Sequence, residues 1–303
     1  IDFNAKINKK KILNNISVNI KKMKFVVIKS LNGTKLSILH EGLTYDVYPQ
    51  KNNTNLLDAI NNFEEIKENE KKILSTKGEI FNREKTTFPF VPLGKIICLG
   101  LNYLDHVKEG GYEVPSYPAL FVRFPSSLIE PNQKMIKPKI SEKLDYEAEL
   151  MVLIGKKTKD VDEKEAEKSV FAYTVFNDGS VRDYQKKTHQ WTPGKNFDGT
   201  GAMGSIYVTP DEVPLGASGL KIQSKVNNQV MQEANTSEMM WPVFKTISTL
   251  SKFATLEKGD LIVMGTPPGV GHARNPAFFL KEGDIVETII DKIDHITNKV
   301  VNE

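Results

Sequence analysis

Beyond residue 88 the chain is a succession of short apolar segments of β-type composition, separated by turns that contain glycine or proline. Strands are expected at residues 95–100, 119–123, 147–155, 172–176, 206–209, 220–226 and 260–264. Helical patterns interrupt them at about 162–169, 180–187 and 238–253. A core with many strands and few helices predicts an α+β fold built on a mixed sheet that forms a β-roll or a barrel-like shape, rather than a doubly wound sheet.

A different pattern precedes this region and predicts a small N-terminal α+β domain at residues 23–88. Two strands joined by a tight turn at Asn32-Gly33, a third strand and two helices are expected at 24–28, 35–39, 44–48, 55–64 and 67–75. The larger domain then occupies residues 89–303. Residues 1–22, which are rich in lysine, asparagine and isoleucine, form an extension or tail.

Composition excludes several classes of function. The 41 lysine and arginine residues nearly balance the 38 aspartate and glutamate residues, and the two signs are mixed along most of the chain, which argues against a nucleic-acid partner. No apolar run approaches the roughly 20 residues that span a bilayer, so a soluble protein is expected. It would be cytoplasmic, or organellar if residues 1–22 are a targeting segment. The single cysteine, Cys98, lies in an apolar run and is expected to be a buried hydrophobe rather than a nucleophile.

Two acidic residues stand at the beginning of an apolar predicted strand. Glu147 and Glu149 are two residues apart, and the two-residue period of a strand puts both side chains on one face. Two carboxylates this close repel each other and raise a pKa unless a cation lies between them, and a divalent metal ion is the natural candidate. A solvent-facing sheet edge with alternating acids explains the segment equally well.

A third carboxylate favours the metal. Asp178 follows the apolar strand at 171–176, where the strand gives way to a predicted helix, and ligands often collect at strand ends. Three carboxylates without a cluster of histidine or cysteine favour Mg²⁺, Mn²⁺ or Ca²⁺ over Zn²⁺. The alternative is that Asp178 merely caps the helix, a role that Ser180 could fill equally well.

A histidine and a glutamate follow the strand at 95–100 with a spacing that suits proton transfer. His106 and Glu109 are three residues apart, so a helical turn places them on one face, where the carboxylate can orient the imidazole. Gly110, Gly111 and Pro115 follow and suggest a mobile lid that brings the pair over a site. An ordinary surface pair is the alternative.

Two glycine-rich loops are suited to binding an anionic substrate, at residues 194–201 and 265–271. Glycines let backbone amides approach a ligand, while Lys195 supplies a charge and Thr266 a hydroxyl. Neither loop has the Walker or the dinucleotide-binding spacing. Turn structure alone explains both loops almost as well.

Together these segments resemble the fumarylacetoacetate hydrolase superfamily, in order and without large gaps, from about Gly94 to Val301. The resembling phrases are GLNYLDH (100–106), DYEAEL (145–150), ND (177–178), RDYQ (182–185), GKNFD (194–198), NT (235–236) and GTPPGVG (265–271). Within the superfamily the chain looks like the branch of acylpyruvases and 2-hydroxyhepta-2,4-diene-1,7-dioate isomerases.

The resemblance implies a mixed β-roll catalytic domain, usually a homodimer, that acts on a small 2-oxo acid. It implies Mg²⁺, with Mn²⁺ or Ca²⁺ as alternatives, at three metal ligands, which are Glu147, Glu149 and Asp178. The implied catalytic residues are His106, Glu109 and Lys195, and the implied substrate contacts are Arg182, Gln185, Thr266 and Arg123. Arg123 stands where the family commonly has lysine, which preserves the charge and puts the fit of the substrate in question.

The expected function is a metal-dependent hydrolase that cleaves a C–C bond in an acylpyruvate-like or fumarylacetoacetate-like 2-oxo acid through an enolate stabilised by the metal. His106 would activate a water molecule and Lys195 would stabilise the oxyanion. The same site would equally serve decarboxylation or tautomerisation of oxaloacetate, or isomerisation of a hydroxymuconate-type diacid. A non-catalytic binding protein of the same fold is the remaining alternative, and the His106–Glu109 pair argues against it.

Overall fold

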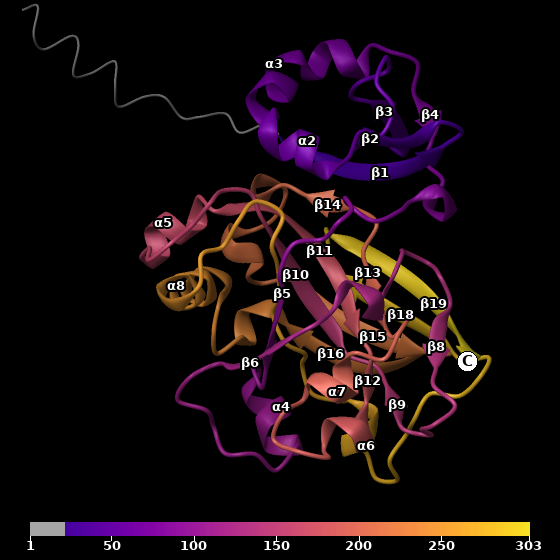
Figure 1. Ribbon diagram of the computed structural model, residues 1–303, viewed down its shortest axis with the longest axis vertical. Coiled ribbons are helices and arrows are strands. Elements are labelled where there is room, and N and C mark those ends of the chain that lie inside the picture. Colours follow the sequence, from indigo (N-terminus) through magenta and orange to yellow (C-terminus); the bar gives the residue numbers. More distant parts are fainter. Residues whose placement is uncertain (1–21) are drawn as a thin grey trace, which may run out of the picture.

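A computed structural model describes residues 22–303, and its largest sheet has twelve strands (Figure 1). Ten strands run in the order β4-β3-β2-β1-β14-β11-β10-β17-β5-β6, and β13 and β7 attach beside β11. Their bounds are β1 Lys24–Ser30, β2 Gly33–His40, β3 Leu43–Asp46, β4 Glu79–Ile80, β5 Ile96–Gly100, β6 Ala119–Val122, β7 Leu128–Ile129, β10 Ala148–Ile154, β11 Val170–Asp178, β13 Gly201–Met203, β14 Tyr207–Val208 and β17 Leu261–Val263. The pairing is mixed, because β17 runs parallel to β5 and β13 parallel to β7.

A second sheet of five strands packs against the centre of the first. Its order is β16-β15-β18-β19-β8, with bounds β8 Met135–Lys137, β15 Lys221–Val226, β16 Gln229–Asn235, β18 Ile285–Ile290 and β19 Asp294–Asn302. Strands β10 and β11 contact β15, β18 and β19 across the layers. A two-stranded ladder of β9 (Leu144–Asp145) and β12 (Ser180–Val181) lies beside them.

Strand β10 shows why this part of the chain is buried on both sides. Leu150 and Val152 point into the cluster shared with the second sheet, while Met151 and Leu153 point into a separate cluster on the opposite face. The alternation follows from the two-residue period of a strand. A continuous apolar run is therefore required here, and the beginning of the strand becomes the place where polar side chains can enter.

The N-terminal unit shares both a sheet and a core with the rest of the molecule. Strand β1 pairs with β14 through Lys24–Val208 and Phe25–Tyr207. The ring of Phe25 stacks on that of Phe171 with centroids 5.9 Å apart. The expected boundary near residue 88 stays a prediction, and residues 1–21 of the expected extension lie outside the described residues.

The first hairpin turn lies one residue earlier than the sequence indicates. Ser30 pairs with Gly33, so Leu31 and Asn32 form the turn and Gly33 begins β2. Gly33 has φ 123°, and a Cβ there would lie 1.8 Å from Oδ1 of Asn53. Glycine is therefore favoured by the positive φ of this residue, and the Asn53 side chain would have to shift to admit a Cβ.

The helices of the described residues are short, with between 4 and 12 residues each. Their bounds are α2 Leu56–Asn61, α3 Phe63–Leu74, α4 Leu104–Glu109, α5 Glu163–Glu167, α6 Arg182–Gln185, α7 Thr192–Lys195 and α8 Val243–Phe253. Helix α8 buries Val243, Ile247 and Leu250, which recur at helical spacing on one face. The helix expected at 180–187 is wrong in its first turn, because Ser180 and Val181 pair with β9 and the helix begins only at Arg182.

These observations bear out the strand-rich α+β fold with mixed sheets. Within residues 22–303 the sheets are open, so the expected barrel-like shape does not close into a barrel. None of the helices in this part of the chain is long and apolar enough to cross a membrane.

Candidate active site

The pairing of β10 with β11 brings three carboxylates together. The amide of Asp178 donates to the carbonyl of Glu147 at 2.9 Å, which sets the two residues opposite each other, and Glu149 pairs with Phe176. One oxygen from each of Glu147, Glu149 and Asp178 lies within 4.8 Å of the others, and all three side chains are buried. The alternatives fail here, because the acids do not face solvent and Asp178 ends β11 while α6 begins after Val181.

Two cations hold the carboxylate of Asp178. Lys195 Nζ donates to Asp178 Oδ2 and to Glu147 Oε2, each at 2.6 Å. Arg123 pairs with Asp178 Oδ1 and also donates to the carbonyl of Gly179 at 3.1 Å. Both cations are buried. The structure thus places Lys195 and Arg123 on the carboxylates, and direct contact of either with a substrate stays a prediction.

Glu149 differs from its two neighbours because no side-chain cation is paired with it among the described residues. Its Oε2 accepts only the amide of Gly265, at 2.6 Å. Burial, with Asp178 and Glu147 nearby, raises the pKa of Glu149 well above its ordinary value. Burial also acts to raise the pKa of Glu147, but Lys195 and an arginine outweigh it and hold that pKa below its ordinary value.

This donor set fits a hard divalent cation. Carboxylate oxygens are the ligands that Mg²⁺, Mn²⁺ and Ca²⁺ prefer. A cation beside Glu149 would supply the positive charge that this buried carboxylate lacks. Glu147, Glu149 and Asp178 therefore remain the proposed metal ligands.

The predicted histidine–glutamate pair is formed on α4. Nδ1 of His106 lies 2.8 Å from Oε1 of Glu109, and the histidine side chain is 8% exposed, so the pair is not an ordinary surface contact. The other carboxylate oxygen, Oε2, accepts the amide of Gly269 at 2.8 Å. Gly269 has φ 102°, and a Cβ there would lie 2.2 Å from the carbonyl oxygen of Met231, so glycine is needed for this close approach. One carboxylate thus orients the imidazole and joins α4 to the 265–271 loop.

Asn196 connects the two loops that carry the cations. Its Oδ1 accepts the amide of Phe124 at 2.6 Å, and its Nδ2 donates to the carbonyl of Val122 at 2.9 Å. These two partners flank Arg123, and Asn196 itself follows Lys195 in the chain. The amide side chain therefore sets the distance between the two cations that share Asp178. Sequence analysis did not single out this residue.

Arg182 is linked to the same cluster from α6. Nη2 lies 2.7 Å from Oε1 of Glu147, and Nε donates to Oδ2 of Asp145 at 2.7 Å. Nη1 donates to Oε1 of Gln185 at 2.9 Å. The predicted substrate contacts Arg182 and Gln185 are therefore adjacent, and each already has a protein partner.

Asp145 and His272 are site residues that sequence analysis missed. Asp145 is fully buried and accepts the amides of Gly271 and His272 at 2.9 and 3.0 Å. The ring Nδ1 of His272 faces the same carboxylate at 3.4 Å. A signal for Asp145 was present, because it shares the two-residue period of Glu147 and Glu149 on one face.

Thr266 has its hydroxyl engaged by the protein. Oγ1 donates to the carbonyl of Ala148 at 3.0 Å and accepts Nε2 of Gln232 at 2.8 Å. The single hydroxyl proton is thus used inside the fold. Substrate binding by this hydroxyl stays a prediction.

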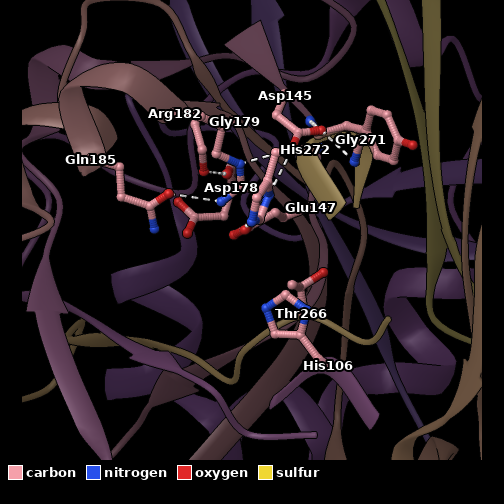
Figure 2. A network of polar contacts seen from close by, with 12 residues as sticks. His106, Asp145, Glu147, Asp178, Gly179, Arg182, Gln185, Thr266, Gly271 and His272 are labelled. Carbon is pink, nitrogen blue, oxygen red and sulfur yellow. Dashed lines mark hydrogen bonds and ion pairs between the residues drawn. The ribbon is translucent and has the colours of Figure 1, made fainter. Parts of the chain in front are cut away.

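One pocket collects most of these side chains. It is lined by His106, Glu147, Glu149, Arg182, Gln185, Lys195, Thr266 and His272, together with the apolar residues Leu99, Phe121 and Trp191. In Figure 2, His272 and Asp145 lie on one side of Glu147, and His106 and Thr266 lie on the other. The remaining predicted site residues contact those that line the pocket. Asp178 belongs to the carboxylate cluster, Glu109 contacts the ring of His106, and Arg123 pairs with Asp178.

A strand-rich fold with a buried carboxylate cluster beside an oriented histidine defines a class of enzyme. The family described as fumarylacetoacetate (FAA) hydrolase C-terminal matches residues 95–301. The chain therefore belongs to the fumarylacetoacetate hydrolase family.

Relatives and solved structures agree with this assignment. The mitochondrial oxaloacetate tautomerase FAHD2A of Bos taurus is 40% identical over 235 residues, which cover 76% of this chain and 74% of that protein. The Homo sapiens protein of the same name is 39% identical with the same coverage. The solved fumarylacetoacetate hydrolase from Exiguobacterium antarcticum has a TM-score of 0.77 and 30% identity, covering 93% of this chain and all of that one. The 2-hydroxyhepta-2,4-diene-1,7-dioate isomerase from Mycobacterium marinum has a TM-score of 0.71 and 26% identity, covering 93% and 99%.

Proposed function

We propose that the chain is a divalent-metal-dependent tautomerase that interconverts the enol and keto forms of oxaloacetate or a closely similar 2-oxo diacid. The observation that carries the proposal is a pocket lined both by Glu147 and Glu149 of the buried three-carboxylate cluster and by the carboxylate-oriented His106. A protein that only binds a metal or a ligand needs the carboxylate cluster but does not need an oriented histidine. Among the reactions that such a site supports, the relatives named oxaloacetate tautomerase favour this one.

Each part of the site has a task in this reaction. Glu147, Glu149 and Asp178 would hold the metal, which when bound supplies a Lewis acid that polarises the 2-oxo group and acidifies C3. His106 then moves the proton at C3. Because Nδ1 faces Glu109, Nε2 is the nitrogen that gives the proton to C3 as the keto form appears and takes it back in the reverse direction.

The supporting residues keep this geometry fixed. Lys195 holds Glu147 and Asp178 together, and Arg123 holds the second oxygen of Asp178. In the forward direction the enol oxygen releases its proton to solvent, C3 gains a proton from Nε2 of His106, and solvent returns one proton to the ring. Atoms and charge therefore balance without any further reactant.

Hydrolysis of an acylpyruvate-like acid is the second candidate. Phe121 and Trp191 make an edge-to-face contact at 5.9 Å between ring centroids and line the pocket, which offers an apolar wall for an acyl group. Lys195 Nζ lies 4.9 Å from the ring centroid of Phe121, so the apolar side chains adjoin the charged part of the pocket. The solved fumarylacetoacetate hydrolase at 30% identity also supports this candidate.

Three attributes accompany the proposal. Mg²⁺ is the proposed metal, with Mn²⁺ or Ca²⁺ as alternatives, because all three proposed ligands are carboxylates. A homodimer is proposed from the family resemblance. Of the two locations that the sequence left open, the relatives named mitochondrial favour the organellar one.

A substrate panel separates the candidates. The purified protein, with Mg²⁺ and with EDTA, is assayed for conversion of the enol of oxaloacetate to the keto form, for loss of CO₂ from oxaloacetate and for pyruvate release from acetylpyruvate. Metal-dependent enol conversion that far exceeds the other two rates supports the tautomerase. Faster pyruvate release from acetylpyruvate would replace it with the hydrolase, and faster CO₂ release with a decarboxylase.

A further inference from the structure

The pocket contains a second carboxylate-oriented histidine that the proposed function does not use. In each of the two pairs, His106 with Glu109 and His272 with Asp145, ring Nδ1 faces a carboxylate oxygen. Both imidazoles line the same pocket. Fixing Nδ1 on a carboxylate leaves Nε2 as the nitrogen available to a ligand.

The fold places His272 here by close packing. Gly271 has no room for a side chain, because a Cβ would lie 2.1 Å from the carbonyl oxygen of Phe278 and 2.6 Å from Oδ1 of Asp145. The amides of Gly271 and His272 both donate to Asp145. The backbone is therefore fixed against this carboxylate, and the His272 side chain, 9% exposed, extends toward the pocket.

The charges around the site show what this imidazole can do. Five carboxylates lie in or beside the pocket, contributed by Glu109, Asp145, Glu147, Glu149 and Asp178, against three cations, which are Lys195, Arg123 and Arg182. A divalent metal would bring this set to neutrality. Lys195 and Arg182 are the lysine and arginine that line the pocket, and each already pairs with two carboxylates, so neither is left unpaired to meet the second carboxylate of a diacid. His272 also lines the pocket, and its ring is fixed through Nδ1. Burial lowers the pKa of His272, so the imidazole is neutral in the free site, and a second carboxylate beside Nε2 would favour its protonated form.

We propose that His272, positioned by Asp145, binds the distal carboxylate of the substrate and so selects 2-oxo diacids over 2-oxo monoacids. This inference rests on the proposed function, in which the 2-oxo acid end of the substrate lies at the metal and His106 acts at C3. His272 lies on the opposite side of Glu147 from His106 in Figure 2, beside the Arg182–Gln185 pair. An imidazole held between Asp145 and a second carboxylate carries a proton on both nitrogens and donates to both anions.

A pair of unreactive ligands tests the inference without catalysis. L-Malate and L-lactate share the 2-hydroxy acid group that binds a metal and differ in the distal carboxylate. Their Kd values are measured by titration calorimetry at saturating Mg²⁺ for the wild type, His272→Ala and His272→Asn, with His295→Ala on the exposed face of β19 as the control. Wild type is expected to prefer malate, and His272→Ala to weaken malate about tenfold while lactate stays within twofold, as loss of one charge-assisted hydrogen bond predicts. His272→Asn, which keeps a donor, should fall between the two, and His295→Ala should match wild type.

The outcomes separate this inference from the function on which it rests. Equal weakening of both ligands, or no change for malate, would overturn the role of His272, as would a wild type that binds the two ligands equally well. Binding of neither ligand by the wild type would remove the metal-chelated substrate of the proposed function, and with it this inference. Retained lactate affinity in His272→Ala also shows that the site is folded.

Discussion

Glu109 and Gly269 are joined by a hydrogen bond of 2.8 Å between segments that lie 160 residues apart in the chain. The same carboxylate faces Nδ1 of His106, so helix α4 and the 265–271 loop are connected through the group that orients this imidazole. The bond from the amide of Gly269 holds the Glu109 carboxylate in the position in which its other oxygen faces the imidazole. We therefore predict that closure of the lid expected from the sequence and orientation of the histidine are coupled.

Glu109→Gln is expected to lower kcat by about 10- to 100-fold and to change KM much less. The amide cannot serve both as an acceptor for the Nδ1 proton and as a charged partner of the imidazolium formed during turnover. Steady-state kinetics with oxaloacetate provide the measurement. Glu113→Gln, an exposed glutamate beyond the same helix, is the matched control and should behave like wild type. A large rise in KM at constant kcat would show that Glu109 acts only in closing the lid.

The carboxylate cluster predicts a coupling between metal and stability. Mn²⁺ or Mg²⁺ at 100 times its Kd should stabilise the wild type by about 2.7 kcal/mol, because the metal binds only the folded protein. Glu149→Gln should lose this increment and be no less stable than wild type in EDTA, because it removes a buried carboxylate whose pKa burial raises. Thermal unfolding with and without metal measures both effects. Glu142→Gln, whose side chain is 82% exposed, is the control, and a metal increment that survives in Glu149→Gln would place the metal elsewhere.

Asn196→Ala should reduce metal affinity by about tenfold as well as costing about 1 to 3 kcal/mol of stability, because it frees the loops that carry Lys195 and Arg123. Asn298→Ala is the control, since Asn298 is buried and donates to the carbonyl of Gln133 at 2.8 Å outside the site. Urea unfolding and metal titration are run on both variants. Similar losses of stability with unequal losses of metal affinity are expected, whereas unchanged metal affinity in Asn196→Ala would leave it a purely structural residue.

Arg123→Met should lower the free energy of unfolding by about 3 to 5 kcal/mol, because it leaves the buried carboxylate of Asp178 with one cation in place of two. Arg123→Lys keeps the charge and should lose less, although it loses the contacts to Ser127 and Thr200. Denaturant unfolding of the two variants measures the difference. Equal stability of Arg123→Met and Arg123→Lys would contradict the role assigned to this ion pair.

The strands around the site were predictable because their patterns are local. The apolar run of β10 and the two-residue spacing of Glu147 and Glu149 follow from strand geometry, and the position of Asp178 follows from the end of the next apolar run. Burial of Cys98 was predicted from its apolar neighbours in the same way and is confirmed.

The missed features depend on contacts between distant segments. Asp145 meets Arg182 and Gly271 across 37 and 126 residues, so its role is set by how the β9–β12 ladder and the last loop pack. The same ladder replaces the first turn of the predicted helix at 180–187, because strand pairing outweighs local helix propensity there. The turn at Leu31-Asn32 was likewise displaced by strand pairing, since Ser30 pairs with Gly33.

Exchange of the C3 hydrogens of oxaloacetate with D₂O, followed by proton NMR, tests most directly whether a metal and His106 act together at C3. The wild type with Mg²⁺ should exchange these hydrogens well above the rate without protein. Removal of the metal with EDTA should abolish the enzymatic rate, and His106→Ala should lower it by about 100-fold or more. Exchange that persists without metal, or that is as fast in His106→Ala as in the wild type, would contradict the proposed function.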